Sequence, residues 1–401
     1  MNTFNEVHTP NHADFVFHRP NAVAHFPHSI EYATRWQTYG SSSGWSTALA
    51  NSALGEHFER KHFYLDIPTH KLSTLDLELT PEECHAFYTA FTQTSSTYTY
   101  DDLKTLQLSF TNAYRLTNFT ACRIPTACIS ILPSENSTDN LIYPMRDTCG
   151  CSAHVTLEHS ITGALKESLE RQFLLRFWLT GVFTESLKFE QGYAALRNSA
   201  SLQLFRELKK SGKLTILNLT DNNFPGSCIL LCYGNDNNQK QPVQYCAGMA
   251  YAKNTSDALE KATIELWQTF RFMHSLYNEP FKTDNIEDPY LRHFIKCNQY
   301  DTYQHITDIA KQETRNTAQL NPTEFNLNNI ISAINRQNLD GYLYVSQSNF
   351  NKSTIYFCKY VSPNLFLHMN NASHFNLRNR YSQSFENSIL PKQLNKMVPF
   401  P

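Results

Sequence analysis

The sequence ALGEHFER at Ala53–Arg60 returns as ALKESLER at Ala164–Arg171, so both copies fit the pattern Ala-Leu-x-Glu-x-x-Glu-Arg. A weaker third copy, ATIELWQ, occupies Ala262–Gln268. Each copy lies in a stretch whose apolar spacing predicts a helix. Residues three apart on a helix share a face, so each copy directs its acidic or amide groups to one side.

The acidic residues of the three copies are Glu56, Glu59, Glu167, Glu170 and Glu265. If the three helices converge, five carboxylates meet, and buried anions repel one another unless cations neutralise them. Magnesium takes oxygen ligands and is often shared between carboxylates and substrate phosphates. The repeat therefore predicts a site for magnesium and a phosphate-bearing substrate.

The alternative interpretation is a solvated helix face. Glu–Arg pairs four residues apart are common on exposed helices and contribute only a few tenths of a kcal/mol. Arg60 and Arg171 can pair in this way with the glutamates of their own copies, or they can contact a phosphate bidentately. Two full copies and a partial third favour a binding site over a repeated surface pattern.

Composition excludes several classes of protein. The chain has 401 residues, 41% of them hydrophobic, and a formal net charge of −2, so it predicts a folded globular protein without the basic surface of a nucleic-acid-binding protein. No apolar run reaches membrane-spanning length, and the N-terminus has no secretory signal pattern. We expect a cytoplasmic protein without a membrane partner. Its ten cysteines form no CxxC pair, which predicts neither disulfides nor a zinc site.

Helical and strand patterns alternate from end to end, which predicts an α/β (mixed α+β) fold. Residues 1–40 contain Pro10, Pro20 and Pro27 and are expected to be irregular, whereas residues 41–401 are expected to form one domain. Predicted helices cover 45–63, 80–92, 159–178 and 257–274; predicted strands cover 72–79, 121–132, 214–218, 227–233, 243–252, 341–347 and 354–361.

Helix starts carry their own signals. The Ser/Gly-rich turn Ser41–Gly44 precedes the first helix and offers N-cap hydroxyls and free N–H groups. Thr80 and Pro81 have the pattern of an N-cap and first residue. Thr255 or Ser256 is expected to cap the third repeat helix.

Further motifs are spread along the chain: GEHFERKHFY at 55–64, RDTCGCS at 146–152, ELWQ at 265–268, RHF at 292–294, SPNLFLHMNN at 362–371 and MVPFP at 397–401. Together with the repeated helix pattern, they resemble the YcaO family of ATP-dependent enzymes that modify peptide backbones. The resemblance covers about residues 40–401. Several unusual motifs in the same order are a specific signal.

The resemblance implies a single α/β domain that binds ATP and magnesium between the glutamate helices. By resemblance, the five glutamates are magnesium ligands and Arg171 also acts in catalysis. The proline-containing tail enters the active site, where the terminal carboxylate of Pro401 assists proton transfer. The implied nucleotide contacts are Ser52, Ser152, Arg171 and Lys261, and Arg146 is a further candidate because of its charge.

The implied activity is that of a cyclodehydratase. It converts Cys and Ser/Thr residues of a ribosomally made precursor peptide to thiazolines and oxazolines, by phosphorylating the backbone amide oxygen with ATP. The product is an azole-modified, microcin-like peptide antibiotic. The implied partners are the precursor peptide, a leader-binding subunit that resembles a ubiquitin-activating enzyme, and an FMN-dependent azoline dehydrogenase.

Two features depart from the family pattern. A Lys that many relatives carry before the first helix is absent, since Gly44-Trp45 follows the serines. The alternating proline tail is also short.

The alternative functions are formation of a thioamide or a macroamidine, and a non-catalytic scaffold subunit. Cys149 and Cys151 are expected to pack in the wall of the site, because the implied chemistry needs no enzyme nucleophile.

Overall fold

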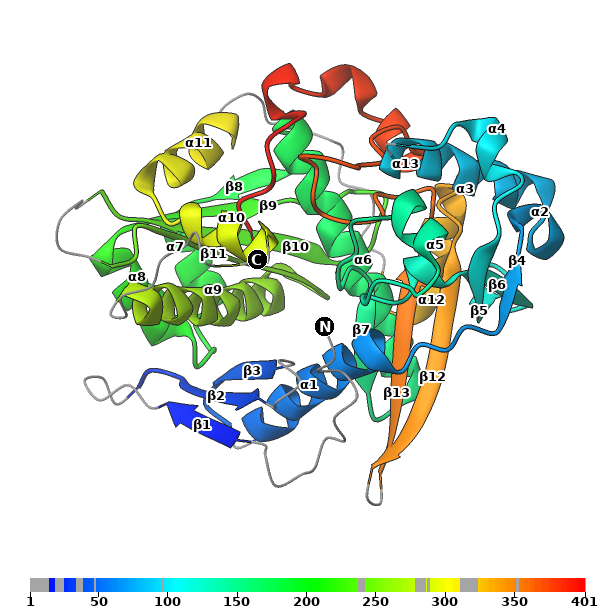
Figure 1. The fold of residues 1–401 in the computed structure, drawn as a ribbon. Helices are drawn as coiled ribbons and strands as arrows, with labels where there is room; N and C mark the ends of the chain where they lie inside the picture. The colour runs from blue at the N-terminus through cyan, green and yellow to red at the C-terminus, as the bar shows by residue number, and fades with distance from the viewer. Residues whose placement is uncertain are drawn as a thin grey trace.

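A computed structural model shows three antiparallel sheets arranged around one long central helix, α6 (Leu157–Thr180) (Figure 1). One core cluster joins α6 to the four-stranded sheet and to the C-terminal residues. The residues that the structure describes are 14–18, 25–33, 39–46, 48–95, 97–236, 242–277, 286, 289–310, 324–350 and 353–400.

The first sheet has three strands in the order β1-β2-β3: Asp14–His18, His28–Ala33 and Tyr39–Gly44. The expectation of an irregular segment is therefore wrong for residues 14–18 and 28–33. Pro20 lies outside the described residues, and Pro27 directly precedes β2, where a proline does not interrupt the strand. The turn expected at Ser41–Gly44 is also wrong, since these residues form most of β3.

The second sheet has the order β11-β10-β9-β8: Tyr245–Ala252, Ser227–Gly234, Lys213–Asn218 and Glu185–Leu187. The strands expected at 214–218, 227–233 and 243–252 are confirmed. All eight residues of β11 are buried. A strand buried on both faces has a continuous apolar sequence, and α9 (Thr255–Tyr277) covers one of these faces.

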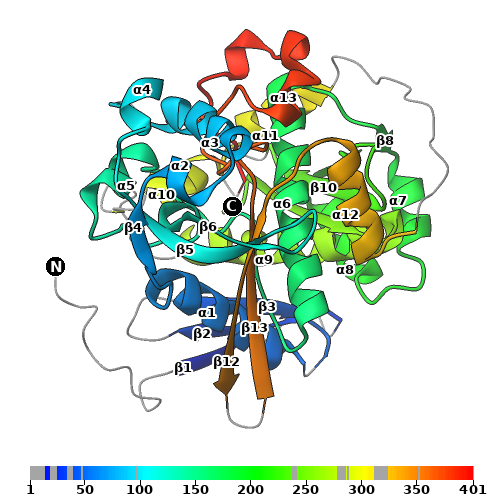
Figure 2. The same ribbon diagram turned by 90° about the vertical axis from the view of Figure 1, so that its right-hand side faces the viewer.

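The third sheet has the order β4-β5-β12-β13-β7, with β6 also paired to β5: Lys71–Ser73, Leu108–Arg115, Tyr342–Phe350, Ser353–Val361, Cys151–His154 and Ala121–Pro125. The long hairpin β12–β13 confirms the predicted late strand pair (Figure 2). β6 is shorter than the expected 121–132, because Pro125 has no N–H for a ladder and a 3₁₀ turn, Thr126–Cys128, follows it.

The strand expected at 72–79 is wrong over most of its length. Only β4 is extended, and a helical turn, α2 (Leu75–Glu78), follows it. The Leu79 N–H donates to the Leu75 carbonyl at 3.0 Å, which closes the turn. Leu75 is fully buried whereas Leu77 is 73% exposed, so the apparent alternation of leucines did not indicate a sheet face.

The three repeat helices form as predicted. They are α1 (Leu49–Leu65), α6 and α9. The Thr156 hydroxyl caps α6 by accepting from the His159 N–H, and Gly181 ends it with φ of +76°, a conformation that glycine adopts without strain. The expected caps are wrong in two places. α1 has no side-chain cap, and the side chain of Asn254 precedes α9 and accepts from the Asp257 N–H.

The helix expected at 80–92 is α3 (Pro81–Thr94), and Thr80 caps it through a capping box with Glu83. No described helix is long and apolar enough to cross a membrane. The remaining α-helices are α4 Tyr100–Leu103, α5 Ser137–Ile142, α7 Phe189–Ala195, α8 Leu202–Ser211, α10 Pro289–Lys296, α11 Tyr300–Ala310, α12 Leu327–Arg336 and α13 Arg380–Gln383.

Candidate functional site

The glutamates of α1 face two strands from different sheets. The Ser41 N–H in β3 donates to Glu56 Oε2 at 2.7 Å, and the backbone of Ala153 in β7 donates to Glu59. Arg60 binds Glu56 Oε1 at 2.6 Å. The Ser41 N–H therefore holds a carboxylate, where the sequence had predicted free N–H groups at a helix start.

The glutamates of α6 are held in the same way. Arg171 binds Glu167 Oε1 at 2.8 Å, and the Tyr251 N–H in β11 donates to Glu170 Oε2 at 2.6 Å. Gly163 lies one turn before Glu167 on this helix. A Cβ added there would lie 2.2 Å from the Ser152 Oγ, so the missing side chain lets β7 approach α6 closely.

Glu265 completes the acidic group from α9. The Met249 N–H in β11 donates to its Oε2 at 3.1 Å. Met249 and Tyr251 are two residues apart and therefore point the same way along β11. One strand, β11, thus donates backbone N–H groups to a glutamate of α6 and to a glutamate of α9.

The five glutamates are electrostatic neighbours in a closed series. Glu56 interacts with Glu59, Glu59 with Glu167, Glu167 with Glu170, Glu170 with Glu265, and Glu265 again with Glu56. The convergence of the three helices is therefore confirmed by the structure. We call this group the carboxylate ring.

Burial and mutual repulsion raise the pKa of most members of the carboxylate ring. Burial, and then Glu56, raise the pKa of Glu59 to about 7. Burial, and then Glu170, raise that of Glu265 to about 8. The pKa of Glu167 lies well above its usual range, chiefly because of burial. Neighbouring carboxylates repel one another when ionised, and a bound cation would favour their ionised form.

The carboxylate ring fits magnesium by its chemistry, because it offers only oxygen donors from several carboxyl groups. In the described part of the chain, no group of three or more His, Cys, Asp or Glu side chains could hold a metal ion as it stands. The glutamates are engaged by arginines and backbone N–H groups instead. Their role as magnesium ligands stays a prediction.

Arg171 is the best-positioned cation of the site. Besides Glu167, its guanidinium contacts the Thr148 hydroxyl at 3.1 Å and lies 3.8 Å from the Asp147 carboxylate. It is mostly buried, at 18% exposure, and these anions hold its pKa well above the usual range against the opposing effect of burial. A permanent, partly buried cation beside the carboxylates suits a transferring phosphoryl group.

Two lysines lie beside Glu170. Lys166 and Lys261 both interact with this carboxylate, and burial, and then Lys261, lower the pKa of Lys166. Lys261, a predicted nucleotide contact, therefore lies at the edge of the carboxylate ring. Its side chain is exposed there. Lys166 has the same neighbours and was not singled out from the sequence.

The two predicted serines occupy different positions. Ser152 lies in β7, against α6 at Gly163. Ser52 is exposed on α1, on the same face as Glu56 and Glu59. The structure therefore places both beside the glutamate helices, and their contact with a nucleotide remains a prediction.

Arg146 is not brought to the carboxylate ring. Its guanidinium donates to the Asn140 Oδ1 at 2.7 Å, to the Tyr143 carbonyl at 3.3 Å and to the Leu132 carbonyl. Burial lowers its pKa, and Asp139 opposes this effect. The side chain therefore secures the loop before α5, and nothing in its contacts directs it to a phosphate.

Sequence reasoning missed Asp147 and Tyr290 as site residues. Asp147 accepts the N–H of Cys149 and that of Met369, each at 2.9 Å, and so supports the motif at 146–152. Tyr290 and Arg171 interact electrostatically. The position of Asp147 in that motif was an available signal, whereas no pattern around Tyr290 pointed to the site.

The C-terminal tail is docked and does not fray. The Tyr245 hydroxyl donates to the Pro399 carbonyl at 3.0 Å, and the Tyr290 hydroxyl donates to the Phe400 carbonyl at 2.7 Å. Phe400 is only 4% exposed. Because Tyr290 also neighbours Arg171, the tail runs toward the carboxylate ring. Pro401 lies outside the described residues, so its catalytic role remains a prediction.

The cysteines behave as expected. All ten are free thiols. Cys149 and Cys151 are buried, and burial raises the pKa of both thiols, which disfavours the nucleophilic thiolate. His57 is also structural: it is 1% exposed and packs edge-to-face on Tyr32 at 4.6 Å.

Comparison with known proteins agrees with this geometry. The family model of YcaO cyclodehydratases, ATP- and Mg²⁺-binding, matches residues 40–366. The chain is 32% identical over 368 residues to the microcin B17-processing protein McbD of Escherichia coli, covering 91% of this chain and 90% of that protein. It also superposes on a chain of the E. coli microcin synthetase McbBCD complex with a TM-score of 0.87, at 29% identity and 96% coverage of both chains.

A second structure, the same E. coli complex with pro-MccB17 bound, matches with a TM-score of 0.84 at 28% identity, again over 96% of both chains. The family model matches most of the sequence, and the solved structures match nearly all of the fold. The two comparisons agree. The chain belongs to the YcaO cyclodehydratase family, which binds ATP and Mg²⁺.

Proposed function

We propose that this chain is the ATP-dependent cyclodehydratase of a complex that matures a microcin-like peptide antibiotic. Its substrate is a ribosomally made precursor peptide, whose Cys and Ser/Thr residues become thiazolines and oxazolines. The observation that carries this proposal is the carboxylate ring with Arg171 beside it, in a chain similar over nearly its whole length to a microcin-processing protein.

The reaction begins when a Cys thiol or a Ser/Thr hydroxyl of the peptide attacks the preceding backbone carbonyl. The resulting oxyanion is a poor leaving group until it accepts the γ-phosphoryl of ATP. Loss of phosphate then leaves the five-membered ring. Magnesium, when bound, neutralises charge on the phosphates.

The chain's own residues then have distinct roles. Glu56, Glu59, Glu167, Glu170 and Glu265 are proposed to hold the magnesium. Arg171 and Lys261 are proposed to face the phosphates, and Ser52 and Ser152 to contact the nucleotide. The buried position of Arg171 supports this role, because a cation shielded from water stabilises developing phosphate charge more strongly.

The C-terminal tail is proposed to assist proton transfer. The chemistry needs a base for the amide proton, and the Pro401 carboxylate is the candidate. The described residues before it support this assignment, because Tyr290 fixes the Phe400 carbonyl and itself neighbours Arg171.

Partners follow from the E. coli relative, whose structures are of the McbBCD complex, alone and with pro-MccB17 bound. We propose that this chain likewise works in the cytoplasm with a precursor peptide and other subunits. A subunit that resembles a ubiquitin-activating enzyme would bind the leader, and an FMN-dependent dehydrogenase would oxidise azolines to azoles.

The test is reconstitution of the chain with proteins encoded beside it, a candidate precursor and Mg-ATP, followed by peptide mass spectrometry. Loss of one water per modified residue is expected. Glu167→Gln should lower the rate at least about 10²-fold, whereas Glu158→Gln, at an exposed position on the same helix, should not. An unchanged peptide mass without ATP turnover would refute the enzyme assignment.

A further inference from the structure

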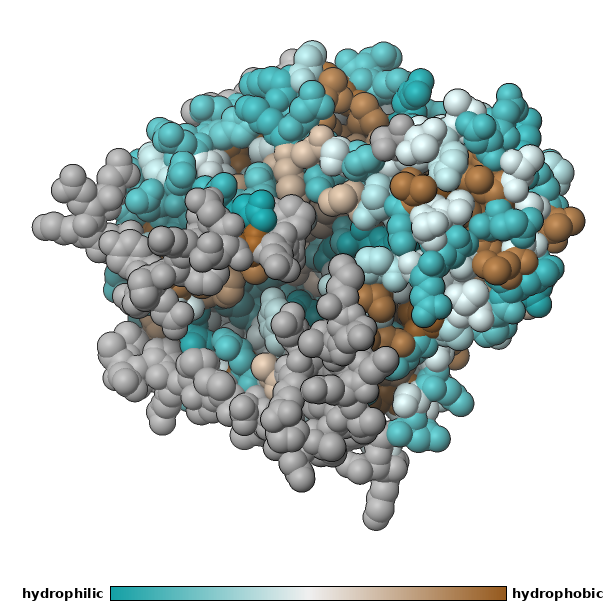
Figure 3. All heavy atoms as spheres, viewed as in Figure 1, coloured by the Kyte–Doolittle hydropathy of each residue, from teal (hydrophilic) through white to brown (hydrophobic). Residues whose placement is uncertain are grey.

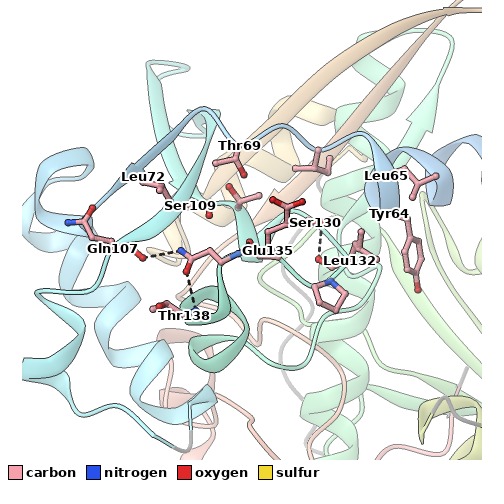
Figure 4. Close-up of a pocket in the computed structure, with 15 residues that line it drawn as sticks. Tyr64, Leu65, Thr69, Leu72, Gln107, Ser109, Ser130, Leu132, Glu135 and Thr138 are labelled. Atoms are coloured by element: carbon pink, nitrogen blue, oxygen red, sulfur yellow. Dashed lines mark hydrogen bonds between the residues drawn. The ribbon is translucent and has the colours of Figure 1, made fainter. Parts of the chain in front are cut away.

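A hollow of about 700 Å³ lies beyond the C-terminal end of α1, and none of the five glutamates lines it (Figure 4). Pockets of roughly 300–1,000 Å³ hold typical small ligands. We call it the α1-end pocket. Its lining includes Tyr64, Leu65, Leu72, Ser109, Ser134 and Glu135.

The α1-end pocket has a defined architecture. Leu72 of β4 and Ser109 of β5 are directly opposed in the ladder and therefore share one face of the sheet. Tyr64 and Leu65, from the end of α1, lie on the other side of the view in Figure 4. The loop 132–138 forms the remaining wall. The pocket is thus bounded by an edge of the third sheet, a helix end and a loop.

Its charge excludes a phosphate ligand. Among the lining residues, Glu135 is the only charged side chain, and Lys, Arg and His are absent. A nucleotide or phosphate would find no cation there and one repelling carboxylate. Neutral hydroxyl and amide groups alternate with apolar side chains, so the lining suits an uncharged or weakly basic ligand that forms hydrogen bonds.

Two apolar side chains at the α1-end pocket are left facing solvent. Leu72 is 60% exposed and Tyr64 is 37% exposed. Figure 3 shows further hydrophobic residues over the part of the surface that carries α2 to α5. Exposed apolar side chains beside a polar hollow are typical of a surface that binds another molecule.

The outer wall of this pocket is tied by hydrogen bonds to α1 and to Arg146. The Ile131 N–H donates to the Phe63 carbonyl at 2.9 Å, which ties the loop to α1. Arg146 binds the Leu132 carbonyl and, through Asn140, the loop that carries Ser134: Asn140 Oδ1 accepts the Ser134 N–H at 2.8 Å.

Arg146 is adjacent in sequence to Asp147. The Asp147 carboxylate lies 3.8 Å from Arg171, which binds Glu167 of the carboxylate ring. The loop that lines the pocket is therefore linked, through Arg146 and its sequence neighbour Asp147, to the element that contacts Arg171. This position suits a part of the substrate that does not itself react.

We propose that the α1-end pocket binds an extended, uncharged segment of the precursor peptide, away from the residue being cyclised. This inference rests on the proposed function, which supplies a substrate rich in uncharged Cys, Ser and Thr residues. Such a segment matches both the neutral hydrogen-bonding groups and the exposed apolar side chains. Binding there would hold the peptide across α1 while one residue reacts at the carboxylate ring.

The direct test is photo-crosslinking in the full complex. Leu72→p-benzoylphenylalanine places a crosslinker at the pocket, and Tyr193→p-benzoylphenylalanine places one on α7, at a 39% exposed control position. Irradiation with precursor peptide should crosslink the peptide at position 72 and not at 193. A crosslink from position 72 to another subunit, or no crosslink to the peptide, would overturn the proposal.

A kinetic test uses two exposed leucines. Leu72→Arg should raise the KM for the peptide at least about fivefold, the effect of 1 kcal/mol, and leave the KM for ATP unchanged. Leu77→Arg, 73% exposed and outside the pocket lining, should change neither value. Equal kinetics for both variants would also overturn it. If the peptide mass shows no loss of water with the wild-type enzyme, the proposed function is refuted. This result does not depend on the crosslinks.

Discussion

Neutralising Glu265 should make the protein more stable at alkaline pH while impairing its function. Burial and Glu170 raise the pKa of this carboxyl from 4.5 to about 8, so the folded chain holds a proton that the unfolded chain has lost. The stability contributed by this group is therefore fully present below about pH 4.5 and is lost as the pH rises through about 8. Glu265→Gln removes this loss and keeps an oxygen that can accept the Met249 N–H.

The difference between 4.5 and about 8 corresponds to roughly 5 kcal/mol, at about 1.4 kcal/mol for each pH unit. This value is an upper bound, because the side chain is not fully removed from solvent. We expect a gain of about 2 kcal/mol, or a melting temperature about 2–3 °C higher for a chain of this length.

The assay is thermal unfolding of the wild type and Glu265→Gln at pH 5 and pH 8.5, with and without Mg-ATP. Without Mg-ATP the two proteins should differ little at pH 5, and the variant should be more stable at pH 8.5. Mg-ATP should stabilise the wild type more than the variant, because the variant lacks a carboxylate that is proposed to bind the ion. Glu185→Gln, an exposed position in β8, serves as the control. A variant less stable than wild type at pH 8.5 without Mg-ATP would refute the reasoning.

Three further outcomes follow from the site. Arg171→Lys keeps the charge but loses the planar fork that contacts Glu167 and Thr148, so kcat should fall by roughly 10²-fold in an ATP turnover assay, and a wild-type rate would remove Arg171 from catalysis. Arg146→Lys should raise the KM for the peptide by roughly two- to tenfold without changing that for ATP; a raised KM for ATP would instead support the nucleotide contact predicted from its charge. Deleting Phe400 and Pro401 empties a buried aromatic position and should cost roughly 3 kcal/mol in denaturant unfolding, whereas deleting Pro401 alone should slow ring formation with little loss of stability. Full activity of the shorter deletion would exclude the Pro401 carboxylate as the base.

The helices of the site could be predicted from the sequence, because their signal is local. Apolar spacing and the repeated Glu-x-x-Glu-Arg pattern located α1, α6 and α9 within a few residues. Their convergence was inferred only from the repetition of acids. The structure supplied the physical reason, which is that each helix packs on a strand that donates N–H groups to its glutamates.

The parts that were not predicted depend on distant contacts. Ser41–Gly44 has the composition of a turn, but pairing with β2 makes it a strand, since tertiary contacts override weak local preferences. Arg146 carries a charge suited to phosphate, yet its partners are the Leu132 carbonyl and Asn140. Composition alone cannot show which of several polar groups a long side chain will reach.

The backbone N–H groups that hold the carboxylate ring have a consequence for the newly made protein. Glu56 depends on the first sheet, Glu59 on the third, and Glu170 and Glu265 on the second. Tyr251 follows Glu170 by 81 residues, so α6 leaves the ribosome before the strand that positions its glutamate. A chain with any one sheet missing lacks part of the proposed magnesium site. With magnesium bound as proposed, an incompletely folded molecule is expected to hydrolyse no ATP.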